Sequence, residues 1–203
     1  MNEPKVSVET SSGEKRVSIE DFLYNDRKIW IEGTITPERV NSVMMQLMIL
    51  EQHVREQRID PSTVEVTFYI EGPGGSISAG LNLYSAMVNS ELKIKTVAVG
   101  TCGSMSAILF LAGDKREMLP HGRLIYHEPC SGRLEELGER KLSHLKEVVE
   151  CLETYHKRIV GIIAKRTGQD ADKVDSLIKP TDFCLTAEEA YQFGAATKLI
   201  RKL

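Results

Sequence analysis

The sequence predicts an α/β fold in which helices cover a mostly parallel sheet. Short apolar runs rich in β-branched residues alternate along the chain with longer segments that have helical apolar spacing. Of the 203 residues, 41% are hydrophobic and 27% are charged, which is ordinary for a globular protein. We find neither an internal repeat nor a long linker. We therefore expect a single folded domain over residues 28–203, preceded by a polar N-terminal arm over residues 1–27.

The strands are predicted from short apolar runs that are bounded by turns or helices. They cover residues 28–33, 64–70, 95–99, 116–119, 123–126 and 197–200. The preceding arm is expected to be irregular, with residues 17–24 as a short segment docked on the domain.

The helices are predicted from apolar periodicity and from residues that favour helix ends. Thr36, Pro37 and Glu38 are typical of a helix start, since they supply an N-cap, a proline at the first helical position and an acid in the first turn. Thr186 and Glu189 have the spacing of a capping box and begin the last helix. The other predicted helices cover residues 78–88, 107–112, 134–166 and 170–178.

Charge and cysteine content argue against several classes of protein. The net charge of −3 gives no electrostatic reason to expect binding to nucleic acid or to an anionic membrane. The four cysteines are widely spaced and form no Cys-x-x-Cys pair, so we expect neither a disulfide framework nor a metal site. The N-terminus lacks the apolar core of a signal peptide, and no apolar run approaches the length of a membrane span. The sequence therefore predicts a cytoplasmic protein.

Ser104 lies in a run of small residues where a predicted strand meets a predicted helix. Backbone N–H groups at a helix N-terminus lack intrahelical partners, so this junction can hold both a nucleophile and the donors that stabilise an oxyanion. The alternative is a serine that only caps the helix, a role worth about 1 kcal/mol.

Three further features follow predicted strands, where α/β folds usually place their sites. Gly74-Gly75 permits positive φ and a close approach to a backbone N–H, or it forms a plain turn; the spacing of a phosphate loop or a dinucleotide fingerprint is absent. His127 is either a general base or a histidine satisfied at a strand end. Asp182 is either partly buried with a partner or an ordinary turn residue.

These residues together suggest a catalytic triad. Ser104 would be the nucleophile, His127 the general base and Asp182 the group that orients the imidazole. The chain order Ser-His-Asp differs from that of the α/β-hydrolases, and the residues around Ser104 do not form their nucleophile elbow. Spacing alone does not separate this triad from three unrelated residues.

The order of several short motifs resembles the ClpP family, the proteolytic subunits of the Clp protease, which belong to the ClpP/crotonase superfamily. The resemblance extends from about Ser12 to Ile200. The matching motifs are Pro73-Gly74-Gly75, Ser104-Met105, His127-Glu128-Pro129, Thr167-Gly168 and the segment 182–187.

The resemblance implies a role for each candidate residue and a setting for the reaction. Ser104, His127 and Asp182 are similar to the family's triad, and the backbone N–H groups of Gly75 and Met105 are similar to its oxyanion hole. The implied activity is that of a serine endopeptidase that hydrolyses unfolded polypeptides and needs no cofactor. The implied partners are further copies of the chain, in heptameric rings stacked as a tetradecamer, and an AAA+ Clp ATPase that feeds substrate.

The implied fold is a ClpP/crotonase-like spiral of ββα units with a protruding handle helix. The handle would lie within about residues 130–166, and residues 12–15 would belong to the loop that lines the axial pore. Neither feature follows from composition or periodicity alone.

The chain departs from the family's pattern at several positions and looks like a divergent member. Glu71-Gly72 replaces the usual Asn-Ser before the Pro-Gly-Gly motif and brings a carboxylate near the substrate strand. Residues 130–136 replace a glycine-rich strand, and the handle is several residues longer, which affects contacts between rings. Of the paired aromatic residues that help form the docking groove for the unfoldase, only Tyr69 is present.

Two other functions remain open on the sequence. The first is a structural ring subunit that assembles with an active paralogue, because the segment after His127 is altered. The second is an acyl-CoA enzyme with the crotonase-like fold, because both groups of proteins use paired backbone donors for an oxyanion.

Overall fold

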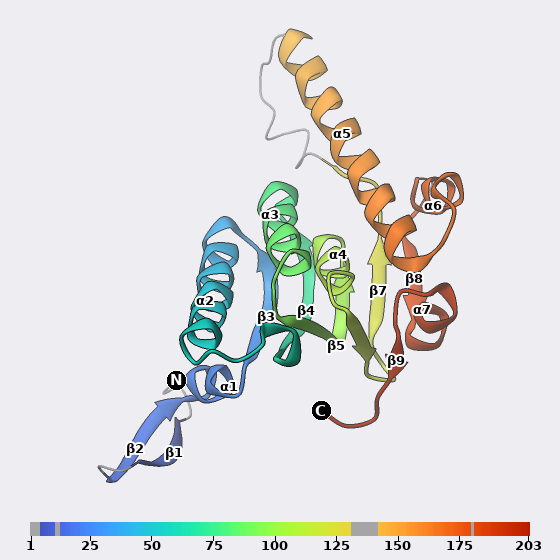
Figure 1. Ribbon diagram of the computed structural model, residues 1–203. Coiled ribbons are helices and arrows are strands. Elements are labelled where there is room, and N and C mark those ends of the chain that lie inside the picture. The colour runs from blue at the N-terminus through green and yellow to red at the C-terminus, as the bar shows by residue number, and fades with distance from the viewer. Residues whose placement is uncertain (1–4, 11–12, 131–141, 180) are drawn as a thin grey trace.

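The computed structural model describes residues 5–10, 13–130, 142–179 and 181–203, and it confirms a mixed α/β fold with a mostly parallel central sheet (Figure 1). The strands are β1 (Lys5–Thr10), β2 (Gly13–Ser18), β3 (Lys28–Ile35), β4 (Glu65–Gly75), β5 (Lys93–Gly103), β6 (Lys115–Met118), β7 (Arg123–Tyr126), β8 (Phe183–Thr186) and β9 (Lys198–Leu199). The helices are α1 (Ile19–Asn25), α2 (Pro37–Glu56), α3 (Ile77–Val88), α4 (Met105–Phe110), α5 (Leu142–Thr167), α6 (Ala171–Ile178) and α7 (Ala187–Phe193), with a short 3-10 turn at Pro61–Thr63.

Strand β5 organises the central sheet because it pairs with two different strands along one side. The strands follow the order β3-β4-β5-β6-β9, and all of these neighbours are parallel. Residues 95–98 of β5 pair with β6, whereas residues 101–103 pair with β7. Strand β7 pairs in turn with β8, in antiparallel orientation. The end of β5 therefore lies beside the β7–β8 pair.

Helices α2, α3 and α4 lie side by side over one face of the sheet (Figure 1). The buried residues of α2 have the helical spacing that predicted this element, and they are Val40, Val43, Leu47, Leu50 and Val54. Every residue of α4 is buried. The helix that follows Ser104 is therefore fixed in the core of the molecule.

The N-terminal segment has more regular structure than the arm or loop that we predicted. Strands β1 and β2 form an antiparallel hairpin that stands apart from the central sheet, and α1 follows it (Figure 1). The side chain of Ser18 caps α1 by accepting the N–H of Asp21 at 3.0 Å. The sequence feature that indicates β1 is the alternation of Val6 and Val8 with polar residues, which has the period of a strand. The boundary between residues 27 and 28 stays a prediction.

Helix α5 is the longest element, and its N-terminal half extends beyond the sheet and the other helices (Figure 1). Its C-terminal half is anchored in the core through Ile159, Val160 and Ile163. The predicted helix over 134–166 begins in residues 131–141, which lie outside the described residues. The assignment of this helix as a handle stays a prediction.

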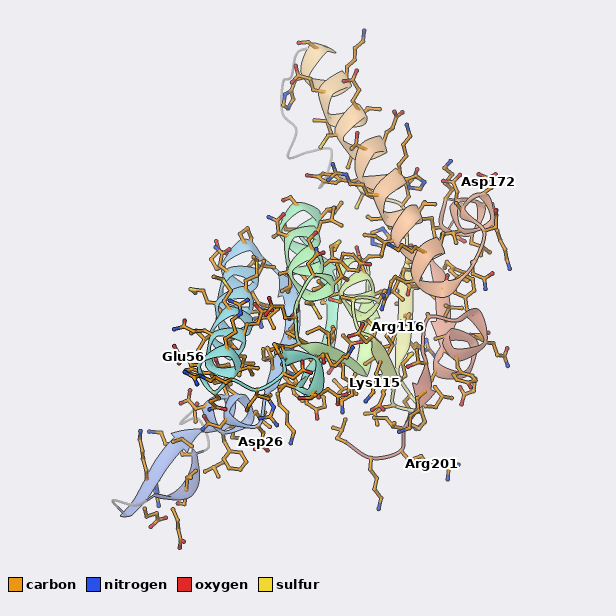
Figure 2. The ribbon with its side chains drawn as sticks, viewed as in Figure 1. Asp26, Glu56, Lys115, Arg116, Asp172 and Arg201 are labelled. Carbon is orange, nitrogen blue, oxygen red and sulfur yellow. The ribbon has the colours of Figure 1, made fainter. Side chains whose placement is uncertain are left out.

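A buried arginine holds the base of α5 against its neighbours. Arg116, labelled in Figure 2, is only 8% exposed. Its guanidinium donates hydrogen bonds to the carbonyls of Ala195 at 2.6 Å and Gly113 at 3.1 Å. It also donates to the carbonyls of Arg166 and Gly194, both at 3.2 Å. Burial, with a smaller contribution from Arg166, lowers the pKa of Arg116. The side chain thus joins β6 to the ends of α4, α5 and α7.

Candidate active site

Ser104 has a strained backbone at the junction of β5 and α4. Its φ of 50° and ψ of −123° lie in a region that side-chain-bearing residues rarely occupy, at a cost of about 1–3 kcal/mol. Its side chain makes no capping hydrogen bond, so the alternative of a stabilising cap is wrong, although Ser104 does hold the N-cap position. Its N–H donates to the carbonyl of Ile125 in β7 at 2.7 Å. Backbone strain without a stabilising role is typical of functional sites.

Gly74 lies directly against Ser104. A Cβ at Gly74 would come within 2.6 Å of the Ser104 Cβ, 2.8 Å of the Gly103 oxygen and 2.9 Å of the Met105 nitrogen. Its φ of 100° also favours glycine. The fold therefore requires glycine at this position, because no other residue allows the backbone of β4 to approach Ser104 so closely.

Gly75 belongs to a strand, so the alternative of a plain turn is wrong. We predicted that the strand ends at residue 70, but β4 continues to Gly75, with a register irregularity where it passes Gly72. Gly74 and Gly75 pair with Thr34 and Ile35 of β3. A Cβ at Gly75 would clash with the backbone oxygen of Ile35. Strand propensity does not predict this part of β4, because it contains three glycines with positive φ and glycine is depleted in strands.

Met105 is the first residue of α4, so its N–H is among the donors that an α-helix leaves without an internal partner. The carbonyl of Ser104 accepts the N–H groups of Ala107 and Ile108, at 3.0 and 3.2 Å. A Cβ at Gly74 would lie 2.9 Å from the Met105 nitrogen, so this donor is next to the end of β4. Such an arrangement of backbone donors suits a developing negative charge.

His127 follows β7 immediately and lies near Ser104 because of the pairing between β5 and β7. Gly103 pairs with Ile125, two residues before His127. The imidazole is half-buried, and its Nδ1 lies 2.7 Å from the backbone oxygen of Glu128. This contact satisfies Nδ1 within its own loop.

Asp182 immediately precedes β8. Tyr126 pairs with Phe183 at the end of the antiparallel ladder, and His127 and Asp182 are the next residues beyond that pair. The side chain of Asp182 is exposed. Among the described residues, no hydrogen bond joins Ser104 to His127 or His127 to Asp182. The fold thus brings the three predicted residues to one edge of the sheet, without the hydrogen bonds of a triad.

The nearest alternative nucleophile, Cys102, is held in an unreactive state. It is fully buried, and its thiol donates to the backbone oxygen of Ile70 at 3.1 Å. Burial, aided by the negative charge of Glu71, raises the pKa of this thiol far above its ordinary value. Because the thiolate is the reactive form of cysteine, Cys102 is a poor nucleophile and Ser104 is the better candidate at this junction.

A cavity of about 590 Å³ lies between the segment after His127 and helix α5. Its lining residues are Glu128, Pro129, Val149, Leu152, Glu153, His156, Lys157 and Lys179. Sequence reasoning marked Val149 and Leu152 only as part of an apolar helix face, since it had no means of pairing α5 with the loop after β7. The cavity has an apolar wall and a charged rim, which suits a side chain of an extended peptide.

An ion-pair network joins α5 to α6 beside this cavity. Asp175 accepts a hydrogen bond from Lys179 at 2.6 Å and lies 2.5 Å from the Nε2 atom of His156. These two hydrogen bonds, that of Lys179 first, hold the pKa of Asp175 below its ordinary value. The network fixes the base of α5 relative to the segment that precedes Asp182.

In the described part of the chain, no group of three or more histidine, cysteine, aspartate or glutamate residues is arranged to hold a metal ion. None of the described helices is both long and apolar enough to cross a membrane.

The chain was compared with models of protein families. The model described as Clp protease matches residues 11–202 of the chain. The match includes β5 and α4, which meet at Ser104, and the segments that carry His127 and Asp182.

Proposed function

The chain belongs to the Clp protease family, and we propose that it is a serine endopeptidase of unfolded polypeptides with Ser104, His127 and Asp182 as its triad. The observation that carries this proposal is the strained backbone of Ser104, packed against Gly74 at the N-terminus of a buried helix. Backbone strain of this kind costs about 1–3 kcal/mol and is concentrated at functional sites.

In the proposed reaction, Ser104 Oγ attacks the scissile carbonyl carbon while His127 Nε2 takes the hydroxyl proton. The backbone N–H groups of Gly75 and Met105 stabilise the negative charge on the carbonyl oxygen. His127 then gives its proton to the leaving amine, and an acyl-enzyme remains on Ser104. A water molecule, deprotonated by His127, attacks the ester and releases the second product with regeneration of the Ser104 hydroxyl. Asp182 orients the imidazole and stabilises its charged form.

Catalysis requires one rearrangement. For the imidazole of His127 to reach both Ser104 and Asp182, its Nδ1 must leave the backbone oxygen of Glu128. This is a local rotation of a half-buried ring, and the three residues each lie next to the end of one of the paired strands β5, β7 and β8. The cavity between Pro129 and α5 would receive a side chain of the substrate.

We further propose that the chain assembles into rings. Members of the Clp protease family generally form oligomeric rings that work with Clp ATPases. Met45, Met48 and Ile49 are exposed on the outer side of α2, although this helix already buries another apolar face. Trp30 and Tyr69 stack at 5.2 Å elsewhere on the surface, and Trp30 is 37% exposed. Two different apolar patches on one molecule favour a head-to-tail contact between copies, which closes into a ring when the rotation permits. Stacked heptamers fed by an AAA+ ATPase are the assembly we expect.

The proposal is tested by labelling the purified protein with a fluorophosphonate and mapping the modified residue by mass spectrometry. Label on Ser104, together with loss of peptide hydrolysis in Ser104→Ala, is the expected result. Ser106→Ala is the matched control, because Ser106 is fully buried two residues away and its hydroxyl has no partner in the structure. Peptide hydrolysis that persists in Ser104→Ala would overturn the proposal.

The position of His127 favours one second candidate, a structural ring subunit that needs an active paralogue. The two functions differ in what the protein does alone. Efficient turnover of a peptide by the purified chain, lost in Ser104→Ala, excludes the structural subunit; assembly into rings without turnover or label supports it.

A further inference from the structure

A groove of about 510 Å³ lies between the second half of α3 and the C-terminal half of α5. Neither Ser104, His127 nor Asp182 lines it, so it is separate from the proposed active site. Nothing in the proposed reaction requires this surface.

The floor of the groove is apolar and open. Leu81 and Val88 of α3 and Ile162 of α5 contribute to it, and Val88 is 41% exposed. Beside them, a Cβ at Gly161 would meet no atom within 4 Å. An exposed apolar surface with free space above a helical glycine can accept an apolar side chain from another molecule.

The rim of the groove is cationic. Arg158, Lys165 and Arg166 line it, and no acidic residue does so. The side chains of Arg158 and Lys165 make no ion pair or hydrogen bond with any described residue. By contrast, several lysines elsewhere in the chain are paired with acids, among them Lys95, Lys115, Lys179 and Lys198. The guanidinium of Arg166 donates to the backbone oxygens of Leu111 and Gly113, which do not neutralise its charge. The rim thus keeps its positive charge, although the chain as a whole has a net charge of −3.

We propose that this groove docks an acidic segment of a partner protein that carries apolar anchor residues. Arg158, Ile162 and Lys165 are spaced four and three residues apart, so they share one face of α5. The two cations stand about 10 Å apart along the helix axis, with the apolar floor between them. A single phosphate or carboxylate cannot bridge that distance, whereas a peptide with acids on both sides of an apolar anchor meets both cations and covers the floor.

The test uses a library of random 12-residue peptides displayed on phage and selected on the wild-type protein. Counter-selection uses Gly161→Leu, which fills the groove at a position with free space and improves helix propensity by about 1 kcal/mol, so that the variant folds. The Gly161→Leu variant keeps the proposed active site, so peptides that bind there are removed. The selected peptides are expected to combine acidic residues with spaced apolar residues.

Anisotropy with a labelled peptide from that selection then measures the contribution of charge. Arg158→Glu combined with Lys165→Glu is expected to weaken binding at least about tenfold, because two attractive charges become repulsive. Lys146→Glu, in the distant half of the same helix, is the matched control and should leave binding unchanged. The proposal is overturned if no peptide distinguishes wild type from Gly161→Leu, if the selected peptides are neutral or basic, or if the reversed rim binds them equally well.

Discussion

The substitution Gly74→Ala gives the sharpest test of the geometry around Ser104. The added methyl group would lie 2.6 Å from the Ser104 Cβ, where two carbon atoms in contact normally stay about 3.5–4.0 Å apart. The other close atoms, the Gly103 oxygen and the Met105 nitrogen, belong to the backbone and cannot swing away. Either β4 or the segment that carries Ser104 must therefore move by about 1 Å.

That movement has a cost in stability and a larger cost in catalysis. Alanine at a φ of 100° and an overpacked contact each cost about 1–3 kcal/mol, so we expect Gly74→Ala to lower the free energy of unfolding by about 2–6 kcal/mol. A displacement of about 1 Å between a nucleophile and its oxyanion donors can lower the rate about 100-fold. We therefore expect kcat/KM for a peptide substrate, and the rate of fluorophosphonate labelling, to fall at least about 100-fold in the folded protein.

The assay compares Gly74→Ala with Gly161→Ala under conditions in which circular dichroism shows both to be folded. At Gly161 a Cβ has free space, so this control should keep wild-type turnover and unfold at the same or a higher temperature. If Gly74→Ala is too unstable to assay, Ser104→Gly tests the backbone strain at Ser104 instead. Glycine tolerates this backbone conformation, so the variant should be about 1–3 kcal/mol more stable than wild type. It should also be inactive, because the nucleophile is removed. Wild-type labelling in Gly74→Ala, or destabilisation in Ser104→Gly, would refute the reasoning.

Three further outcomes follow from buried and paired groups elsewhere in the chain. Tyr126→Phe removes a hydroxyl that is buried without a partner, so its thermal midpoint should equal or exceed that of the wild type; a clear decrease would contradict this. Arg116→Met leaves the carbonyl oxygens of Ala195, Arg166 and Gly194 without their donor and should cost about 3–5 kcal/mol in a urea titration, whereas a loss below about 1 kcal/mol would show that the guanidinium does not anchor α5. The pKa of Asp175 is lowered by Lys179 and His156, so its contribution to stability is present above the ordinary carboxyl pKa of about 4 and is lost as the pH falls through the lowered value. Asp175→Asn should therefore be less stable than wild type at pH 6 and converge with it near pH 2, and a difference that persists at pH 2 would count against this assignment.

Periodicity and capping residues were enough to predict most elements of the fold. The apolar stripe of α2 and its start at Thr36 were predicted correctly, as was the capping box of Thr186 and Glu189, in which both hydrogen bonds are present. These signals are local, so no knowledge of tertiary contacts was needed. The hairpin of β1 and β2 was missed because polar composition outweighed the alternation of its valines.

The positive φ and the close approach at Gly74-Gly75 were among the predicted alternatives, but the end of strand β4 was placed too early, because its continuation depends on contacts that are distant in sequence. Glycine has a poor strand propensity, so Gly74-Gly75 predicts a turn. In the folded chain, β3 and Ser104 approach so closely that only glycine fits, and the strand continues. The sequence could identify Ser104 as a candidate, but only the packing reveals its strained backbone and excludes a capping role.

The convergence of Ser104, His127 and Asp182 depends on one topological feature, the division of β5 between two partners. If β5 paired with β6 along its whole length, the strand that precedes His127 would have no place beside Ser104. At residues 101–103, β5 pairs with β7 instead of β6. Strand β8 pairs with β7 in a register that sets Phe183 opposite Tyr126. All three residues therefore lie at one edge of the sheet. Strand pairing of this kind is not encoded in the spacing of the residues.

The orientation of His127 is decided by a small difference in free energy. The hydrogen bond from its ring to the oxygen of Glu128 and one to Asp182 would each contribute about 1 kcal/mol, or up to about 3 kcal/mol with a charged partner. Asp182 is exposed, and water competes for its oxygens, which removes much of the advantage of the charged partner. If another molecule covers Asp182 and excludes this water, the hydrogen bond between Asp182 and His127 becomes stronger. The strength of the competing hydrogen bond to the Glu128 oxygen is not changed by covering Asp182. If copies of the chain assemble around this edge, the catalytic orientation is favoured, and activity should then rise with oligomeric state as the protein concentration increases.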